Sequence, residues 1–177
     1  MEQALEPIAA LVTKPISPEA PAGTWVRYQP EFEALKQQID KITTIRPQDV
    51  DWGQVVSTAS SILESKSKDL LVASYLAAGL QVKQGVAGLV DGLTSVTGMC
   101  ETFWDSLYPE TRRMRARISA LEWLVERLPA EIKKTTPRPA DTEGIARALA
   151  VVERLDGLLG EKLGGDAPSL GDLTRAL

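Results

Sequence analysis

The stretch that decides the fold is residues 89–132, LVDGLTSVTGMCETFWDSLYPETRRMRARISALEWLVERLPAEI. Six apolar residues of its first half follow one another at alternating intervals of 4 and 3, which places them on one face of a helix. These are Leu89, Leu93, Val96, Cys100, Phe103 and Leu107. The same alternation returns after Pro109 with Met114, Ile118, Leu121, Val125, Leu128 and Ile132. Because only a short Tyr-Pro-Glu turn separates the two patterns, they predict an antiparallel helical hairpin.

The residues before this stretch predict further helices. Pro30 suits the first position of a helix that runs to about Ile42. After a loop that contains Pro47, Asp51 can cap a second helix that begins at Trp52.

The run 65–70, SKSKDL, is expected to end that helix and to start the next one. Ser67 is the expected cap, and Asp69 places a negative charge at the positive end of the new helix. A narrow stripe of small and apolar residues then suits close helix packing. It consists of Ala73, Leu76, Ala77 and Leu80. Gly85 is placed to terminate this helix, and the glycines around it indicate helix ends or close backbone approach rather than a phosphate loop.

Residues 1–29 are predicted to be an irregular leader with one short helical turn. Three prolines and Gly23 fall within nine residues of it, which forbids a continuous helix (Pro15, Pro18 and Pro21). Trp25 and Tyr28 are poor candidates for full exposure, so we expect the leader to be ordered.

After the hairpin, Pro137 and Pro139 indicate a short linker. Asp141 can cap a helix that the Gly164-Gly165 pair ends. Ser169, with Asp172 three residues on, resembles a capping box for a last short helix, which looks as if the natural chain continues beyond it.

These patterns predict an all-α protein, a multi-helix bundle of antiparallel helices with an irregular, proline-rich leader. No segment alternates with period two, so no sheet is expected. We expect one helical domain at residues 1–134, a linker at 135–140 and a helical extension at 141–177. The extension either begins a middle domain or folds back on the bundle.

The composition argues against catalysis. The chain contains no histidine, which removes the usual triads, the imidazole acid–base and most zinc and iron sites. The single cysteine, Cys100, lies on an apolar helix face and is expected to be a buried hydrophobe rather than a nucleophile. No catalytic, cofactor-binding or metal-binding residue is therefore predicted.

The net charge and the hydropathy of the sequence argue against nucleic-acid binding and against insertion into a membrane. A net charge of −4 argues against a nucleic-acid partner, which requires clustered excess Lys and Arg. No apolar run approaches the roughly 20 residues that span a bilayer, so this segment is not expected to insert into a membrane. The opening Met1-Glu2-Gln3 lacks the basic start of a secretory signal, and we expect a cytoplasmic protein.

The candidate partner-binding residues are aromatic and arginine side chains, the types that dominate interface energetics. They are Trp25, Tyr28, Arg113, Arg117 and Trp123. Arg113 and Arg117 are four residues apart and would share a helix face. The alternatives are that the tryptophans anchor the core and that the arginines between 112 and 117 form a solvated face.

An ordered set of local sequences resembles a known family. It comprises Pro18, Ala22-Gly23, Arg27-Tyr28 and Phe32, then Asp51-Trp52, the run Leu63 to Leu70, Gly85 with Gly88-Leu89 and Gly92-Leu93, Phe103-Trp104-Asp105, Leu107-Tyr108-Pro109, Arg117 with Leu121, and Trp123-Leu124. Together, over about residues 15–125, these resemble the ImpA-type N-terminal domain of the TssA-like proteins of bacterial type VI secretion systems.

The resemblance implies a cytoplasmic component of a contractile, phage-tail-like injection machine. Such proteins help to assemble the baseplate and the sheath-and-tube tail through contacts and not through catalysis. Members usually continue into a middle domain and a variable C-terminal domain, and in some members the C-terminal domain forms rings. The family also includes tail-stopping and membrane-attached relatives. The implied partners are baseplate, sheath or tube proteins, with self-association as a further option.

Two other readings of the function stay open at this point. The chain could be a generic cytoplasmic helical adaptor from another assembly, which genomic neighbours would distinguish. An enzyme of an unfamiliar kind would require a carboxylate pair or a lysine with an unusual pKa in a pocket.

Overall fold

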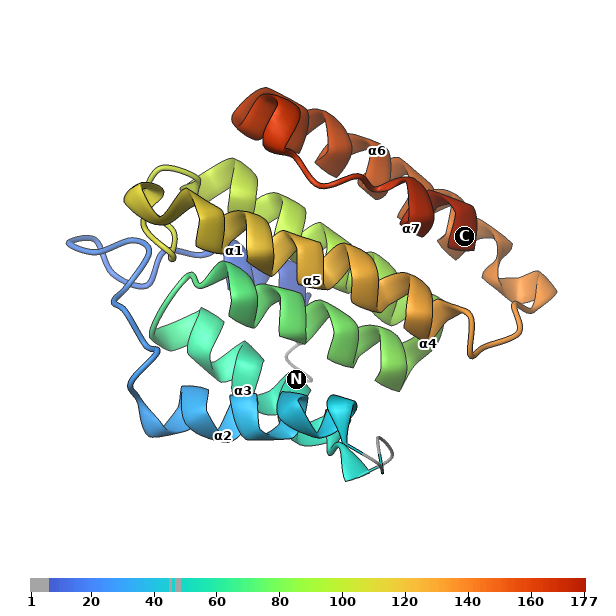
Figure 1. Cartoon of the computed structure of the whole chain (residues 1–177), viewed down its shortest axis with the longest axis horizontal. Helices are drawn as coiled ribbons and strands as arrows, with labels where there is room; N and C mark the ends of the chain where they lie inside the picture. Colours follow the sequence, from blue (N-terminus) through green and yellow to red (C-terminus); the bar gives the residue numbers. More distant parts are fainter. Residues whose placement is uncertain (1–6, 45, 47–48) are drawn as a thin grey trace, which may run out of the picture.

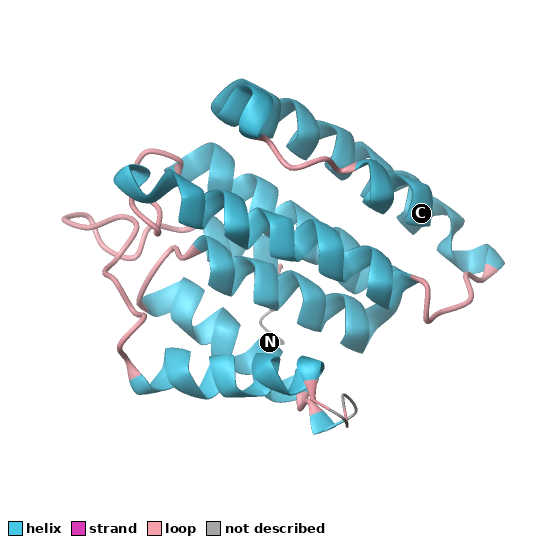
Figure 2. Cartoon of the chain, in the orientation of Figure 1, coloured by secondary structure: helices cyan, strands magenta, loops and turns pink. Residues whose placement is uncertain are grey.

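The computed structural model describes residues 7–44, 46 and 49–177. The α-helices are α1 (Ile8–Thr13), α2 (Pro30–Asp40), α3 (Trp52–Ser65), α4 (Leu70–Phe103), α5 (Met114–Ile132), α6 (Thr142–Leu163) and α7 (Gly171–Ala176). Short 3-10 helices lie at η1 (Lys41–Thr43), η3 (Thr111–Arg113), η4 (Pro139–Asp141) and η5 (Gly164–Asp166). Figure 2 shows helices and loops and no strand within these described ranges, which confirms the all-α class. The opening residues Met1-Glu2-Gln3 and the expected loop at Pro47 lie outside the described residues.

Helix α4 is two antiparallel arms, residues 70–84 and 86–103, joined at Gly85. Gly85 has φ 63° and ψ −135°, a conformation that is not helical. A Cβ atom added at Gly92 would lie 2.6 Å from the Cα of Ala77, although these residues are 15 apart in the chain. A continuous helix would separate them by roughly 22 Å. The predicted helix end at Gly85 is therefore confirmed, and small residues let the two arms touch.

The two arms of α4 form the centre of the bundle, and every other α-helix packs around them or around a neighbour (Figure 1). α3 packs on α4 and carries α2 on its outer side, α5 covers another face, and α1 lies against α3 and α4. One hydrophobic core cluster runs through all seven helices.

The extension at 141–177 packs onto the same core. Four residues of α6 are buried in the core cluster that α4 belongs to: Ala148, Val152, Leu155 and Leu159. Arg154 of α6 also pairs with Glu101 of α4, and α7 contacts α5. The boundary at residues 135–140 stays a prediction, although the extension is folded back on the bundle in the structure.

Several helix starts match the sequence and others differ. The carboxylate of Asp51 accepts a hydrogen bond from the Gln54 N–H and caps α3, as predicted. Helix α6 ends at Gly164, which has φ 56°. The cap of α4 is Asp69 and not Ser67, because the Asp69 carboxylate reaches the N–H groups of the first turn. The Asp141 carboxylate accepts from the Arg138 N–H instead of capping α6.

Two further expectations about helix ends are wrong. The first helix of the hairpin ends at Phe103, and a connection of several residues, not a three-residue turn, leads to η3. The capping box of α7 is absent, because the helix begins after Leu170 and the Asp172 carboxylate pairs with Arg175.

Substituting Gly85→Ala should lower the free energy of unfolding by about 1–3 kcal/mol, because alanine is strained at this positive φ. An added Cβ meets nothing within 4 Å there, so the cost comes from the backbone alone. Urea unfolding followed by far-UV circular dichroism measures it.

The matched control is Gly157→Ala inside α6, where an added Cβ also meets nothing and φ is not positive. It should raise stability by about 0.5–1 kcal/mol. Equal stability of Gly85→Ala and the parent chain would show that the reversal does not depend on glycine.

Candidate partner-binding surface

The connection 66–69, between α3 and α4, is held on both sides by backbone hydrogen bonds. On one side the leader contacts it: the Thr24 N–H donates to the Lys66 carbonyl at 3.0 Å, and the Lys68 N–H donates to Ala22 at 2.8 Å. On the other side the Tyr108 N–H donates to the Lys68 carbonyl at 2.9 Å. Segments far apart in the sequence are thereby joined at one end of the bundle.

The fully buried carboxylate of Asp69 fixes the leader to α4. It accepts from the Leu71 and Val72 N–H groups at 2.9 and 3.2 Å, which caps the helix. It also accepts from Arg27 twice, from Nε at 2.7 Å and from Nη2 at 3.0 Å. A bidentate Arg–carboxylate pair has defined geometry and is stronger than a neutral hydrogen bond. One side chain therefore positions both the central helix and the leader.

Trp25 lies at the meeting point of the leader and η3. The guanidinium carbon atoms of Arg27 and Arg113 each lie 5.2 Å from its ring centroid, within the range of cation–π attraction. Tyr108 packs edge-on against the same ring with centroids 5.9 Å apart. The structure therefore brings together two predicted residues, Trp25 and Arg113, that are 88 positions apart.

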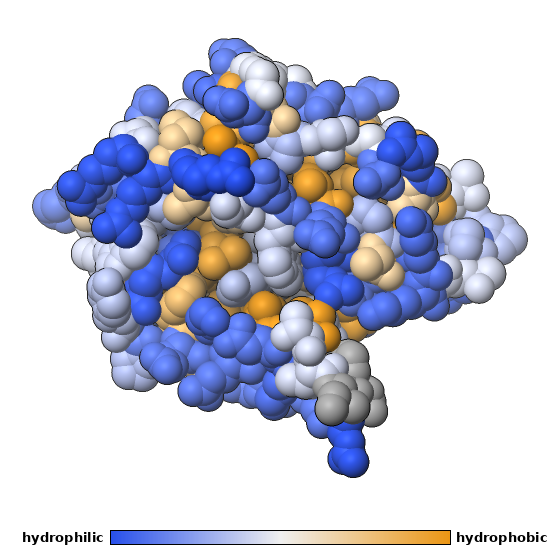
Figure 3. Space-filling view, in the orientation of Figure 1, coloured by the Kyte–Doolittle hydropathy of each residue, from blue (hydrophilic) through white to orange (hydrophobic). Residues whose placement is uncertain are grey.

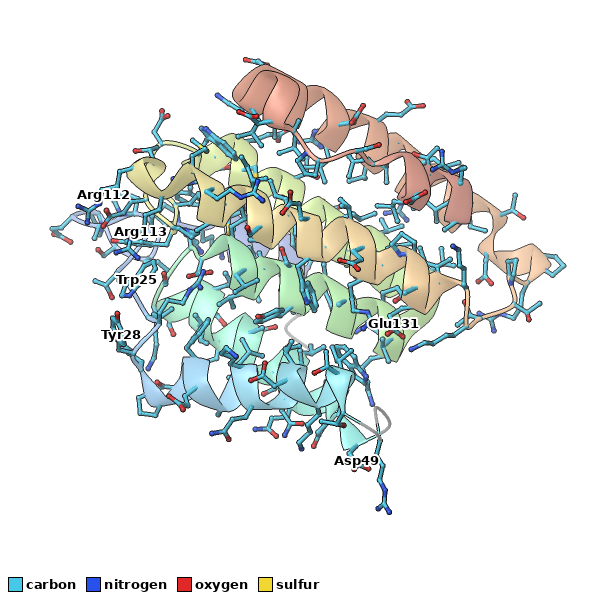
Figure 4. All side chains as sticks on the ribbon, in the orientation of Figure 1. Trp25, Tyr28, Asp49, Arg112, Arg113 and Glu131 are labelled. Atoms are coloured by element: carbon cyan, nitrogen blue, oxygen red, sulfur yellow. The ribbon has the colours of Figure 1, made fainter. Side chains whose placement is uncertain are left out.

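We call Trp25, Arg27, Tyr28 and Arg113 the aromatic–arginine edge. Tyr28 is 91% exposed, and Figure 4 shows it on the same side of the molecule as Trp25 and Arg113. Arg113 is exposed and forms no ion pair with any residue that the structure describes. Its neighbour Arg112, by contrast, pairs with Glu110. The edge therefore offers a free guanidinium next to exposed aromatic surface.

Arg117 is fully buried, so the prediction that it shares an exposed face with Arg113 is wrong. Its guanidinium donates to the carbonyls of Trp104 at 2.6 Å and Leu107 at 2.7 Å, and also to Pro109. Burial lowers the pKa of Arg117 from its ordinary value. Its role is to hold the connection between α4 and η3, since these carbonyls have no helical partner there.

Trp123 lies in a different part of the molecule. It is half-buried on α5 and packs edge-on against Tyr75, with ring centroids 4.8 Å apart. Trp104 is buried, and Trp52 packs partly buried on the core, as the core-anchoring alternative expected.

Lys68 is a buried charge that the sequence analysis did not single out. Its side chain is fully buried, its ammonium donates to the Leu63 carbonyl at 2.6 Å, and it lies 5.5 Å from the Phe103 ring centroid. Burial lowers its pKa from 10.5 to about 8. No spacing rule could have identified it, because the run SKSKDL reads as an exposed, charged connection.

The remaining chemistry of the described residues is limited. Within the ranges that the structure covers, no group of three or more Cys, Asp or Glu side chains could hold a metal ion. Burial raises the pKa of the Cys100 thiol to about 12, so it stays protonated at neutral pH. No helix among the described residues is long and apolar enough to cross a membrane.

The described part of the chain is thus an all-α helical bundle with aromatic and guanidinium side chains gathered at one edge (Figure 4). The family model described as ImpA, N-terminal, type VI secretion system matches residues 13–126, so the chain belongs to that family. This confirms the resemblance noted in the sequence.

One curated protein and one solved structure are also similar to this chain. The type VI secretion system component TssA1 of Pseudomonas aeruginosa is 31% identical in an alignment of 124 residues that covers 62% of this chain and 35% of the relative. The chain thus spans about a third of the length of this curated relative. The N-terminal domain of the TssA component from Burkholderia cenocepacia, which includes the conserved ImpA_N region, matches with a TM-score of 0.80 and 21% identity. The match covers 96% of this chain and 89% of that one, and it shows the fold.

Because burial lowers the pKa of Lys68, we expect the free energy of unfolding to depend on pH. The pKa of Lys68 is about 8 in the folded chain and 10.5 for an ordinary exposed lysine, so between these values the unfolded chain binds more protons. Stability from this group therefore rises with pH across that window, by up to about 1.4 kcal/mol per pH unit. Below the folded pKa, Lys68 is protonated in both states and its burial destabilises the fold.

Urea unfolding of the parent chain and of Lys68→Met, between pH of about 7.5 and about 9.5, isolates this contribution. The parent should gain stability relative to the variant as the pH rises. The comparison with Lys68→Met is needed because Cys100 also makes stability depend on pH. The pKa of its thiol is raised from 9.0 to about 12, so above pH 9.0 its contribution to the free energy of unfolding falls as the pH rises. Parallel curves for the two proteins would contradict the assignment.

Proposed function

We propose that the chain is a non-catalytic assembly component of a bacterial type VI secretion apparatus, acting in the cytoplasm. It takes part in the assembly of the baseplate and of the tube-and-sheath tail through protein–protein contacts. Membership of the ImpA N-terminal family supports the choice of apparatus, and the likeness to TssA1, a component of a type VI secretion system, supports the same choice.

The observation that carries the proposal is the arrangement at the aromatic–arginine edge. Trp, Tyr and Arg are the residues most enriched among interface positions that carry most of the binding energy. Arg113 stacks on Trp25 and keeps its hydrogen-bond donors without a carboxylate among the described residues. Because Arg27 is held by Asp69, the platform is preformed and little conformational freedom is lost on binding.

The proposed partners at this edge are baseplate, sheath or tube proteins that present a carboxylate. Tyr28 supplies apolar contact area, and Arg113 supplies a fork of donors that matches a carboxylate. Trp123 packs against Tyr75 and lies outside this edge. Arg117 is fully buried, so it is not a contact residue for a partner.

The test is a tagged pull-down from a lysate of the source bacterium with its apparatus expressed, quantified by mass spectrometry. Arg113→Glu should reduce the recovery of baseplate, sheath or tube proteins by about tenfold or more, because hot-spot losses are typically above 1–2 kcal/mol. The thermal unfolding midpoint should fall by no more than about 4 °C, since Arg113 is exposed and its contact with Trp25 is worth about 0.5–1 kcal/mol.

Arg115→Glu is the matched control, because Arg115 is exposed on the same run but, unlike Arg113, its guanidinium pairs with a carboxylate, that of Glu122 at 3.8 Å. It should retain the parent's recovery. Unchanged recovery with Arg113→Glu would reject the edge, and no recovery with the folded parent chain would reject the assembly role of this segment.

A further inference from the structure

A hollow lies between α2 and α5, away from the aromatic–arginine edge. It is a hollow of about 450 Å³ formed by the end of α2, η1 and the second half of α5. Its apolar lining includes Ile39, Ile42, Tyr75, Trp123 and Ala130. Figure 3 shows apolar atoms in the depression between the lower helices and α5.

Three side chains that line this hollow carry a hydrogen-bond donor that has no acceptor among the described residues, and of these donors only the Arg127 Nε is a buried atom. Tyr75 is only 5% exposed, and among the described residues no group accepts a hydrogen bond from its hydroxyl. The Nε of Arg127 is buried and has no partner, although its Nη2 lies 3.1 Å from Glu131. The Trp123 indole N–H is likewise without an acceptor in the described part of the chain.

These donors indicate which groups an occupant of the hollow would present. A buried polar group without a partner costs about 1–3 kcal/mol, and among the three donors this applies to the Arg127 Nε. The Tyr75 hydroxyl and the Trp123 indole N–H are not buried atoms of this kind, so they can donate to an acceptor of an occupant. Burial raises the pKa of Tyr75 to about 12, and its hydroxyl therefore remains a donor at neutral pH. Backbone carbonyls of an extended peptide provide neutral acceptors at regular intervals.

The charged residues at the rim of the hollow indicate which kind of peptide would bind there. Glu126 is exposed and forms no ion pair with a described residue. Asp40, on the facing element, is paired with Lys36 only through an exposed contact at 2.8 Å. The charge of Arg127 is compensated by Glu131, which also pairs with Lys134 at 2.9 Å. The rim is therefore acidic and disfavours a carboxylate-bearing occupant.

We propose that this hollow binds a peptide segment of a partner protein in which an apolar residue stands next to a lysine or arginine. The apolar side chain packs against Trp123 and Ile42, and the segment's carbonyls accept from Tyr75 and Arg127. The basic side chain pairs with Glu126. This site is independent of the aromatic–arginine edge, since Arg113 and Arg127 lie 14 residues apart and α5 separates them by roughly 21 Å.

The experiment is a selection from a phage-displayed library of random 12-residue peptides on the purified parent chain, with counter-selection on Ala130→Arg. Ala130 is half-buried on the lining of the hollow, and arginine there would fill it. Ala116→Arg is the matched control, because Ala116 is exposed on α5 and does not line the hollow. Thermal unfolding verifies that both variants are folded.

The expected result is a set of peptides that bind the parent and Ala116→Arg and lose at least tenfold in affinity for Ala130→Arg. They should share an apolar residue adjacent to Lys or Arg. Peptides that bind Ala130→Arg equally, or no enrichment above background, would overturn the proposal. The library contains no designed secretion component, so this result is independent of the assembly role.

A second pair of variants keeps the test decisive if Ala130→Arg does not fold. Glu126→Lys should weaken a selected synthetic peptide by at least fivefold, measured by calorimetry, whereas Glu122→Lys, one turn earlier on α5, should not. Equal effects of the two substitutions, or a selected set in which acidic residues replace basic ones, would contradict the proposed partner chemistry.

Discussion

The buried carboxylate of Asp69 is the interaction on which the rest of the structure depends. It caps α4, whose two arms form the centre of the bundle, and it holds Arg27 of the leader in a bidentate pair. Removing one partner of a buried charged pair leaves the other unsatisfied, which is why such a pair is sensitive to substitution. Since Arg27 in turn contacts Trp25, the exposed edge follows from a contact made inside the protein.

The helices could be predicted from the sequence because their apolar residues repeat with a helical period. Residues 89–132 indicated a hairpin, Gly85 indicated a chain reversal, and Asp51 indicated a cap, all of which are local properties. Helix ends were less predictable. Phe103 ends α4 early because Arg117 supplies donors for the carbonyls that follow, and this contact spans more than ten residues.

The candidate site shows the limit of local patterns more clearly. The proximity of Trp25 and Arg113 depends on packing of segments 88 residues apart, and periodicity contains no information about it. Arg117 was misplaced even though a usable signal existed. It precedes Leu121, Leu124 and Leu128 at intervals of 4, 3 and 4, all of them buried, so it lies on the buried face. A charged residue on such a face requires a buried partner, and here the partners are carbonyls.

The two proposed surfaces lie on the same helical bundle. The aromatic–arginine edge lies at the beginning of α5, and the hollow lies along its second half. The same hydrophobic core supports both surfaces. The two proposed surfaces are therefore held at a set separation by one folded unit.

The central claim is that Asp69 locks the leader to the bundle. Amide hydrogen exchange in the parent chain and in Asp69→Asn tests it most directly, because asparagine can still cap a helix but lacks the charge. The account predicts that the N–H groups of Thr24 and Lys68 exchange at least about tenfold faster in the variant, while that of Leu124 in α5 is unchanged. Unchanged exchange at Thr24 and Lys68 would show that the leader is held by other contacts and would contradict the account.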